Sequence, residues 1–324
     1  MLIELSTDLF PSPPSTIELN ALAHLALTGR HRLIISDDRD PAFLKWLGSL
    51  SDDHQMEWRL ILTEGYELES REPARRELKV TANGPADWSI SPPTLSLSNA
   101  VVYLQLPFIA MLEDWSSDRA FLLAVSTPEQ RSYLLKMEER NALQFANGGG
   151  ITNMPKQIIS HVSNPGGAYR LWSLFDGDGM QPAMPSRDSE RMRQTCEKAG
   201  VPHKQLSRRS IENYLPEVIL GRWAQLSRNE RMKKFRAFSR MRLEQKSHYN
   251  MKDGFHQDSK RTDASAGSLF DDLHENSKNT LQNGFGGQIA ELFINNHVSE
   301  SILRDSGSWD EINGFVSELV ELVR

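Results

Sequence analysis

Cysteine is almost absent from this sequence, since Cys196 is the single one among 324 residues. One thiol cannot form an intramolecular disulfide, which favours a reducing compartment, and we expect a cytoplasmic protein. No apolar run reaches the roughly 18–20 residues of a membrane helix, so we expect no membrane partner. The stretch MLIELSTDLFPSPPS lacks the basic segment that precedes the apolar run of a secretory signal. Cys196 lies in RMRQTCEKAG, which has the pattern of an ordinary helix.

The sequence also lacks G-x-x-x-x-G-K-[ST], the phosphate-binding loop of many ATPases. Its charge of −6 is unevenly spread. Residues 1–112 carry 15 Asp/Glu against 9 Lys/Arg, whereas residues 222–261 carry 12 Lys/Arg against 4 Asp/Glu. A basic stretch of this kind suits binding to a phosphate backbone. The alternative is a solvated helix surface.

Residues 1–95 have the pattern of a small α/β domain, whose role the sequence does not indicate. HRLIIS (31–36) and EWRLILTEG (57–65) are apolar runs that predict strands, and DPAFLKWLGSL between them has helical spacing. GPADWSISPPTLS (84–96) contains two adjacent prolines, which favour an extended chain. We therefore predict a domain boundary there.

Residues 98–220 alternate strand-like and helical patterns. The strand-like runs are FIAML, ALQFANGGG and AYRLWSLF, and SDRAFLLAV and PKQIISHVS between them have helical character. This alternation predicts βαβ units and a parallel sheet. Residues 221–324 are predicted to be mostly helical, with a basic segment ERMKKFRAFSRMRLEQK and a mobile loop at 253–268. The expected fold class is α/β with a parallel sheet.

Acidic residues follow two of the predicted strands. Asp176 and Asp178 follow LWSLF in LWSLFDGDG, Glu113 follows FIAML, and Asp118 opens the next helix. In an open parallel sheet, ligands gather at the carboxyl ends of the strands. Carboxylates that converge there repel one another, and a hard divalent cation relieves that repulsion. We therefore predict that these four acids bind Mg²⁺ or Mn²⁺.

The order of these motifs resembles the Toprim domain of topoisomerases, bacterial primases and OLD-type nucleases. HKQLSRRSIENYLP (203–216) is similar to the segment that closes this domain in OLD-like and related antiphage nucleases. NGGGI (147–151) resembles its glycine turn, and MKDGF (251–255) a downstream lysine-glycine element. The resemblance covers about residues 98–255. One departure is that four residues instead of three separate Glu113 from Asp118, and Asp114 replaces the usual glycine.

The resemblance implies a Mg²⁺- or Mn²⁺-dependent nuclease that hydrolyses DNA or RNA, as the effector of a bacterial antiphage system with an ATPase partner in trans. It leaves homo-oligomerisation open. Glu113, Asp176 and Asp178 would take part in catalysis by binding the metal ion. Glu113 would alternatively act as general acid/base. Lys252 would assist catalysis. Glu212 would either complete a second metal site or cap a helix.

Two further sets of residues follow from the basic segments. The predicted nucleic-acid-binding residues are Arg208, Arg209, Arg231, Lys233, Lys234, Arg236, Arg240 and Arg242. Contacts of this kind are made mainly to the backbone and depend on salt. Phe235 and Phe238 lie among these cations and would either stack on bases or pack in the core.

Two other functions compete with a nuclease. One is a Toprim-like subunit that is catalytically inactive and only binds a partner. The other is a phosphatase of the haloacid-dehalogenase type, because FDGDG matches its Asp-x-Asp-Gly pattern. That fold usually carries the motif on its first core strand, and it would give Glu113 no role. Dependence on Mg²⁺ or Mn²⁺, and loss of activity in Glu113→Gln, would separate an enzyme from an interaction subunit.

Overall fold

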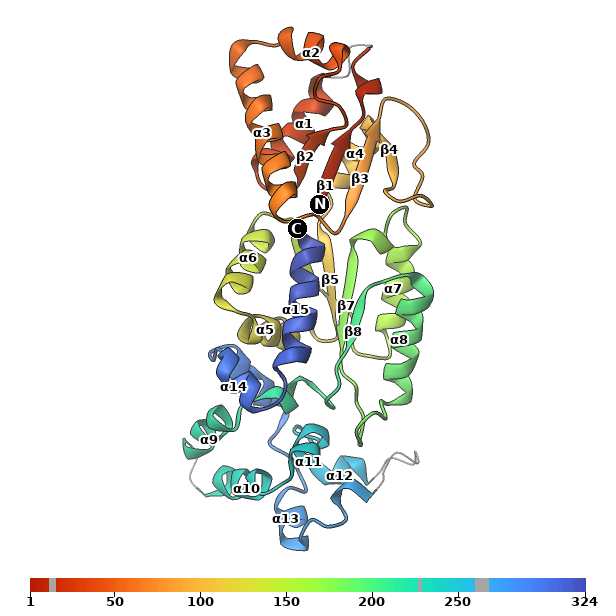
Figure 1. Cartoon of the computed structure of the whole chain (residues 1–324). Coiled ribbons are helices and arrows are strands. Elements are labelled where there is room, and N and C mark those ends of the chain that lie inside the picture. Colours follow the sequence, from red (N-terminus) through yellow and green to blue (C-terminus); the bar gives the residue numbers. More distant parts are fainter. Residues whose placement is uncertain (12–15, 227–228, 260–267) are drawn as a thin grey trace. The chain divides into compact units, whose positions relative to one another are not determined.

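The computed structural model describes residues 1–11, 16–226, 229–259 and 268–324 (Figure 1). Two compact units and two four-stranded sheets organise these residues. The first unit consists of Met1–Phe108, Ser132–Gln144 and Ser317–Arg324, and the second of Ile109–Arg131 and Phe145–Val316. The predicted α/β class is confirmed by the parallel strand pairs that both sheets contain.

The sheet of the first unit has the strand order β2-β1-β3-β4. Its strands are β1 (Leu2–Leu5), β2 (Arg32–Ile35), β3 (Glu77–Thr81) and β4 (Thr94–Ser96). Its helices are α1 (Thr16–Leu27), α2 (Pro41–Gly48), α3 (Asp52–Arg71) and α4 (Leu97–Leu104), with a 3-10 turn η1 (Thr7–Leu9). The strand predicted in HRLIIS is confirmed as β2, and the helix predicted in DPAFLKWLGSL as α2.

The strand predicted at 57–65 is wrong, because this segment lies inside the 20-residue helix α3. Trp58, Ile61, Leu62 and Gly65 are the buried residues of α3, and their spacing of three and four residues places them on one side of a helix. Gly65 packs closely against β2, since a Cβ atom there would lie 2.1 Å from the Leu33 carbonyl oxygen.

The proline-rich segment at 84–96 does not end the first unit. Its last residues form β4, which pairs in parallel with β3, and α4 follows within the same unit. The structure therefore divides the chain differently from the predicted domains 1–95, 98–220 and 221–324. The first unit continues to Phe108, and the residues of the second unit include most of the two later predicted domains.

The second sheet has the order β6-β5-β7-β8. Its strands are β5 (Phe108–Leu112), β6 (Leu143–Asn147), β7 (Leu171–Phe175) and β8 (His203–Gln205). The helices that connect them are α5 (Trp115–Val125), α6 (Pro128–Glu139), α7 (Met154–Val162) and α8 (Arg187–Ala199), with a 3-10 turn η2 (Ala168–Arg170). The strands and helices predicted between 108 and 175 are confirmed in this order.

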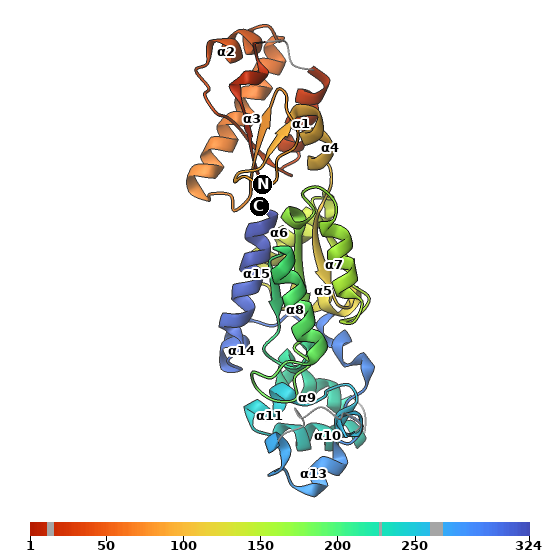
Figure 2. The same cartoon turned by 90° about the vertical axis from the view of Figure 1, so that its right-hand side faces the viewer.

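Strand β7 is buried along its whole length, as its continuous apolar run predicts. Met111, Phe175 and Cys196 belong to the core that packs beside it, and helices α7 and α8 lie side by side over this face (Figure 2). The chain leaves β5 towards β6 and then returns past β5 to β7. The direction of winding therefore reverses between β5 and β7, which is the topological switch point of the sheet.

The described residues after β8 are helical or irregular. The 3-10 turns are η3 (Ile211–Tyr214), η4 (Ser268–Phe270) and η5 (Gly287–Phe293). The helices are α9 (Glu217–Gln225), α10 (Glu230–Ser239), α11 (Leu243–His248), α12 (Gly254–Asp258), α13 (Glu275–Thr280), α14 (Glu300–Asp305) and α15 (Trp309–Val323). The loop predicted at 253–268 is wrong for 254–258, which form α12, and residues 260–267 lie outside the described residues.

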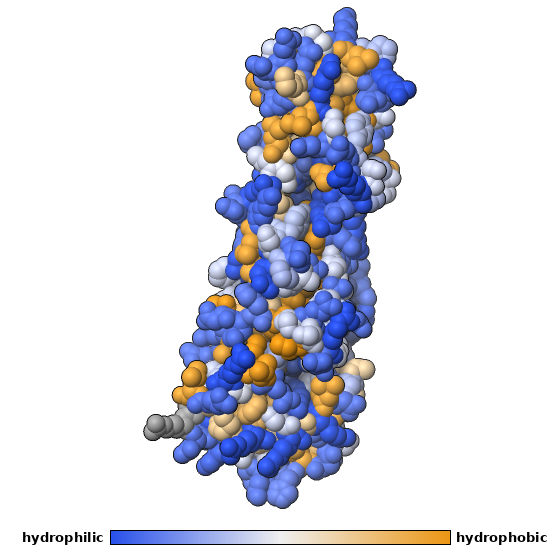
Figure 3. All heavy atoms as spheres, turned by 60° about the vertical axis from the view of Figure 1, so that its left-hand side comes forward, coloured by the Kyte–Doolittle hydropathy of each residue, from blue (hydrophilic) through white to orange (hydrophobic). Residues whose placement is uncertain are grey.

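Hydrophilic side chains predominate on the face of the molecule in Figure 3, with hydrophobic side chains in separate patches. Among the helices of the described residues, none is both long and apolar enough to cross a membrane.

Candidate active site

The acidic residues predicted from the sequence follow two neighbouring strands. Glu113 comes directly after β5, and Asp176 directly after β7. The two strands pair in parallel, with Leu112 opposite Leu174, so their carboxyl ends lie at the same edge of the sheet. This edge is the switch point, where open α/β sheets bind their ligands.

Glu113 and Asp176 are in direct contact although 63 residues separate them in the sequence. The backbone N–H of Asp176 donates to Oε2 of Glu113 at 3.3 Å. Burial, and after it the charge of Asp178, raises the pKa of Glu113 to about 7. Burial also raises the pKa of Asp176 well above its ordinary value, with contributions from Glu113 and Glu212. These carboxyl groups therefore interact as one cluster.

Asp118 joins the same cluster from the first turn of α5. Its side chain is buried and accepts a hydrogen bond from the Asp114 N–H at 2.9 Å. Burial raises the pKa of Asp118 to about 8, and Glu113 and Glu212 add to the shift. Asp114, which stands where the resemblance expects glycine, caps α5 by accepting from the N–H groups of Ser116 and Ser117.

Glu212 contributes a fifth carboxylate from η3, and it is fully buried. The cap of this turn is formed by Ser210 and Asn213, so the helix-capping alternative for Glu212 is wrong. Nζ of Lys252 lies 3.0 Å from Oε1 of Glu212. Apart from this ion pair, neither carboxylate oxygen of Glu212 has a hydrogen-bond partner among the described residues. A buried carboxylate in this state is costly and marks a place for a cation.

Lys252 is the cation that faces the cluster. Burial disfavours its charged form, but Glu212 and Asp176 outweigh burial and raise the pKa of Lys252 above its ordinary value. The side chain is 43% exposed, so the ammonium can also meet a molecule arriving from solvent. One ammonium faces five carboxyl groups, and the raised pKa values of Glu113, Asp118 and Asp176 show that these groups resist carrying their charges together.

The oxygen donors of this cluster suit Mg²⁺ and Mn²⁺, which prefer carboxylates and water. No three His, Cys, Asp or Glu side chains in the described part of the chain stand close enough together to form a finished metal site. Oε2 of Glu212, which has no partner among the described residues, nevertheless fits a hard cation. Such a cation would also relieve the mutual repulsion of the neighbouring carboxyl groups. Binding would require these side chains to draw closer around the ion.

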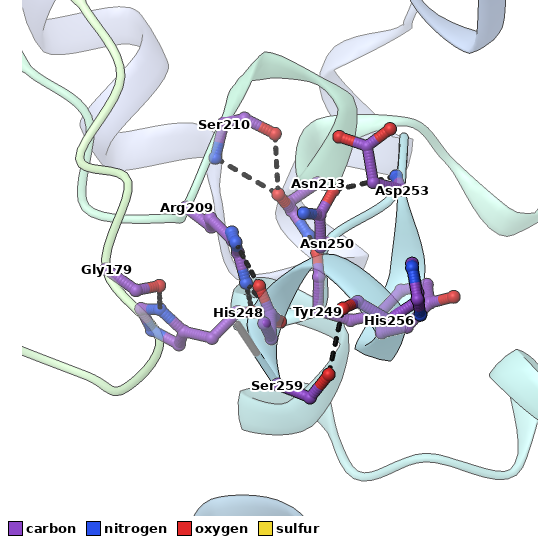
Figure 4. A network of polar contacts seen from close by, with 11 residues as sticks. Gly179, Arg209, Ser210, Asn213, His248, Tyr249, Asn250, Asp253, His256 and Ser259 are labelled. Carbon is purple, nitrogen blue, oxygen red and sulfur yellow. Dashed lines mark hydrogen bonds and ion pairs between the residues drawn. The ribbon is translucent and has the colours of Figure 1, made fainter. Parts of the chain in front are cut away.

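Arg208 and Arg209, predicted to bind nucleic acid, are engaged inside the protein. Arg208 donates to the carbonyl oxygens of Asn213 and Ser306 and lies over the ring of Tyr214. Arg209, which Figure 4 labels, is 3% exposed. It pairs with Asp258. The sequence shows their charge but gives no signal of this burial.

The predicted cations of 231–242 fall into two groups. Lys234 donates to the Gly284 carbonyl, Arg231 lies over the Trp223 ring, and Arg242 pairs with Asp272. Arg242 remains exposed in its surface ion pair, and Lys233, Arg236 and Arg240 are exposed as well. The last three are spaced three and four residues apart along α10 and just beyond it, so they face the same side of the helix.

The core alternative is confirmed for Phe238, which is buried in contact with the rings of Tyr249 and Phe285. The edge of the Phe235 ring lies close to Gly221 on the neighbouring helix α9.

A cavity of about 400 Å³ in the first unit is lined by apolar, acidic and basic residues, and the basic ones include Arg30, Arg140 and Lys136. None of the predicted catalytic residues lines it. The carboxylate cluster is the stronger candidate for chemistry, because it combines the switch point with buried ionisable groups whose pKa values are shifted.

The chain matches no family model, no curated protein and no solved structure.

Proposed function

We propose that this protein is a Mg²⁺- or Mn²⁺-dependent nuclease with a Toprim-like domain, which hydrolyses phosphodiester bonds of DNA or RNA. The observation that carries this proposal is the cluster of buried carboxyl groups at the switch point of the second sheet. Glu113, Asp176 and Asp178 would hold the metal, and Asp118 and Glu212 would complete its surroundings. The motif order that resembles Toprim supports the same assignment.

The bound metal would supply Lewis-acid chemistry, polarising the phosphate and lowering the pKa of a water molecule. The residues of the chain have roles of their own. Lys252 keeps its charge and would bind a phosphate oxygen, which offsets the negative charge that develops during cleavage. Glu113, whose pKa is about 7 in the metal-free cluster, would alternatively act as general acid/base instead of binding metal, exchanging a proton at its carboxylate near neutral pH.

The exposed cations Lys233, Arg236 and Arg240 would bind the nucleic-acid backbone. Within the part of the chain that the structure describes, these side chains are exposed, whereas Arg208 and Arg209 are engaged in internal contacts. Contacts of this type do not read base sequence, so we propose binding that depends on salt and little on sequence.

An ATPase partner in trans and a role in antiphage defence remain proposals that rest on the resemblance. They fit the missing phosphate-binding loop of this sequence. A tagged copy of the protein expressed in its native host should retain an ATPase. Recovery without any nucleotide-hydrolysing protein would count against this partner.

The nuclease is tested by incubating the purified protein with plasmid, linear DNA and total RNA, with Mn²⁺ or with EDTA. We expect cleavage only with metal, and none with Glu113→Gln. Isothermal titration with Mn²⁺ is measured on the same samples. A wild-type protein that binds no Mn²⁺ would overturn the metal site. Binding without cleavage, in the presence of the recovered partner, would favour the inactive interaction subunit.

The structure gives no support to the haloacid-dehalogenase alternative. Glu113 has no role in that mechanism, yet it contacts Asp176 directly.

A further inference from the structure

The backbone of Asp178 is held in an unfavourable conformation. Its φ angle is +51°, in the left-handed region that non-glycine residues rarely adopt. Such a conformation persists only where the surrounding structure fixes it, and it is found preferentially at functional sites. The contacts that fix the backbone of Asp178 therefore influence where its carboxylate lies relative to Glu113.

Arg209 provides the first restraint through its backbone. The N–H of Asp178 donates to the Arg209 carbonyl oxygen at 2.7 Å. The loop also lies close against this segment at Gly177, where a Cβ atom would be 2.5 Å from the Leu206 carbonyl oxygen. The position of Asp178 thus depends on the position of residues 206–209.

The side chain of Arg209 is itself anchored to α12. Its two terminal nitrogens lie 2.8 and 2.7 Å from the two carboxylate oxygens of Asp258, and both side chains are buried. The backbone N–H of Arg209 also donates to the Ser247 carbonyl at 2.9 Å. A bidentate pair fixes both distance and orientation, and removing one partner leaves a buried charge uncompensated.

The segment from α11 to α12 holds the other end of the same loop. Nδ1 of His248 lies 3.0 Å from the Gly179 carbonyl oxygen (Figure 4). The side-chain amide of Asn213 donates to the carbonyl oxygens of Lys246 and Tyr249. Lys252 lies between the two helices of this segment and reaches Glu212. One short piece of chain thus contacts both the Asp178 loop and η3.

We propose that Arg209 and Asp258 are positioning residues, whose ion pair locks the α11–α12 segment against the Asp176–Gly179 loop and so sets the geometry in which Asp178 meets metal. This inference rests on the proposed function, because the geometry of Asp178 matters for a bound cation. It also assigns Arg209 a role other than contact with nucleic acid.

The test uses Asp258→Asn in the full chain, with Glu300→Gln as the matched control. Glu300 also pairs with an arginine, Arg304, but both side chains are about half exposed. Hydrogen exchange is measured for the peptide that contains Asp178, and the Mn²⁺ concentration at half-saturation is measured by titration. In Asp258→Asn, we expect the rate of hydrogen exchange at the Asp178 amide to rise at least about tenfold. The half-saturating Mn²⁺ concentration should rise by at least about the same factor. Neither quantity should change in Glu300→Gln.

A second variant distinguishes a change in the position of the loop from general unfolding. Arg209→Met combined with Asp258→Leu replaces the buried pair by apolar side chains, an exchange that often preserves stability. We expect it to remain folded in thermal unfolding and still to show faster exchange at Asp178 and weaker Mn²⁺ binding. A purely structural pair would change the unfolding temperature alone.

The possible outcomes separate this inference from the proposed function. If both variants keep wild-type exchange at Asp178 and wild-type Mn²⁺ binding, the positioning role is refuted. If the variants accelerate exchange at Asp178 while the wild-type protein binds no Mn²⁺, the positioning of the loop is upheld and the metal-dependent function fails.

Discussion

Replacing Glu113 by Gln should stabilise the metal-free protein at alkaline pH while it abolishes activity. Burial and Asp178 raise the pKa of Glu113 from 4.5 to about 7. Because the folded-state pKa lies above the unfolded-state pKa, the contribution of Glu113 to the free energy of unfolding is fully present below about pH 4.5. This contribution is lost as the pH rises through about 7. At 1.36 kcal/mol per pKa unit, this shift corresponds to about 3 kcal/mol at pH 8.

The Gln side chain carries no charge at any of these pH values, so the variant avoids the decrease in the free energy of unfolding that ionisation of Glu113 causes. Its side-chain oxygen can still accept the hydrogen bond from the Asp176 N–H. We therefore expect Glu113→Gln to exceed the wild type by up to about 3 kcal/mol at pH 8, and by less than about 1 kcal/mol at pH 5. Neighbouring carboxyl groups share protons with Glu113, which makes the larger value an upper bound.

Urea unfolding in EDTA at pH 5 and pH 8 measures these differences, with Glu291→Gln, an exposed acid on η5, as the matched control. Saturating Mn²⁺ should reverse the order at pH 8, because it stabilises only the protein that binds it. A variant that is less stable than the wild type in EDTA at pH 8, or that has the same pH dependence, would refute the reasoning.

Three other predictions test separate parts of the site and the fold. Lys252→Met should lower kcat by about 10²-fold with little change in nucleic-acid affinity, measured by steady-state cleavage, because it removes an ammonium that acts on the developing charge. Replacing Lys233, Arg236 and Arg240 together by Gln should reduce the steepness with which the logarithm of the nucleic-acid association constant falls with the logarithm of salt concentration by about 2 to 3. Fluorescence anisotropy measures this slope, and an unchanged slope would exclude these cations from the interface. Gly65→Ala should destabilise the fold by about 1–3 kcal/mol in urea unfolding, because its Cβ would meet a β2 carbonyl, and a neutral effect would show that α3 can shift.

Much of the acidic cluster could be predicted from sequence because its members carry local signals. Glu113 and Asp176 each end an apolar run, and a parallel sheet brings such ends to one edge. The alternation of strands and helices predicted that sheet. The adjacency of β5 and β7 has no local signal, since it depends on the path by which the chain returns past β5.

The failures of prediction also have physical reasons. The apolar residues at 60–62 are adjacent in the sequence and resemble a strand, whereas the helical spacing of the residues that α3 buries against neighbours such as β2 extends from Trp58 to Gly65. Arg208 and Arg209 carry a charge that suggests phosphate, but each has a partner from a distant segment, Ser306 and Asp258 respectively. His248 and Asp258 were missed as neighbours of the site for the same reason, because each acts through a tertiary contact.

The cost of the cluster is itself an argument for function. Five carboxyl groups face one lysine, the oxygens of Glu212 have no partner among the described residues apart from the ion pair with Lys252, and Asp178 adopts a left-handed backbone. Each feature lowers the stability of the folded chain, and apolar side chains could fill the same edge of the sheet without these losses. Unfavourable features that converge at the switch point are typical of a binding or catalytic site, where a ligand supplies the missing interactions. A divalent cation is the ligand that would relieve charge repulsion and unmet hydrogen bonding together.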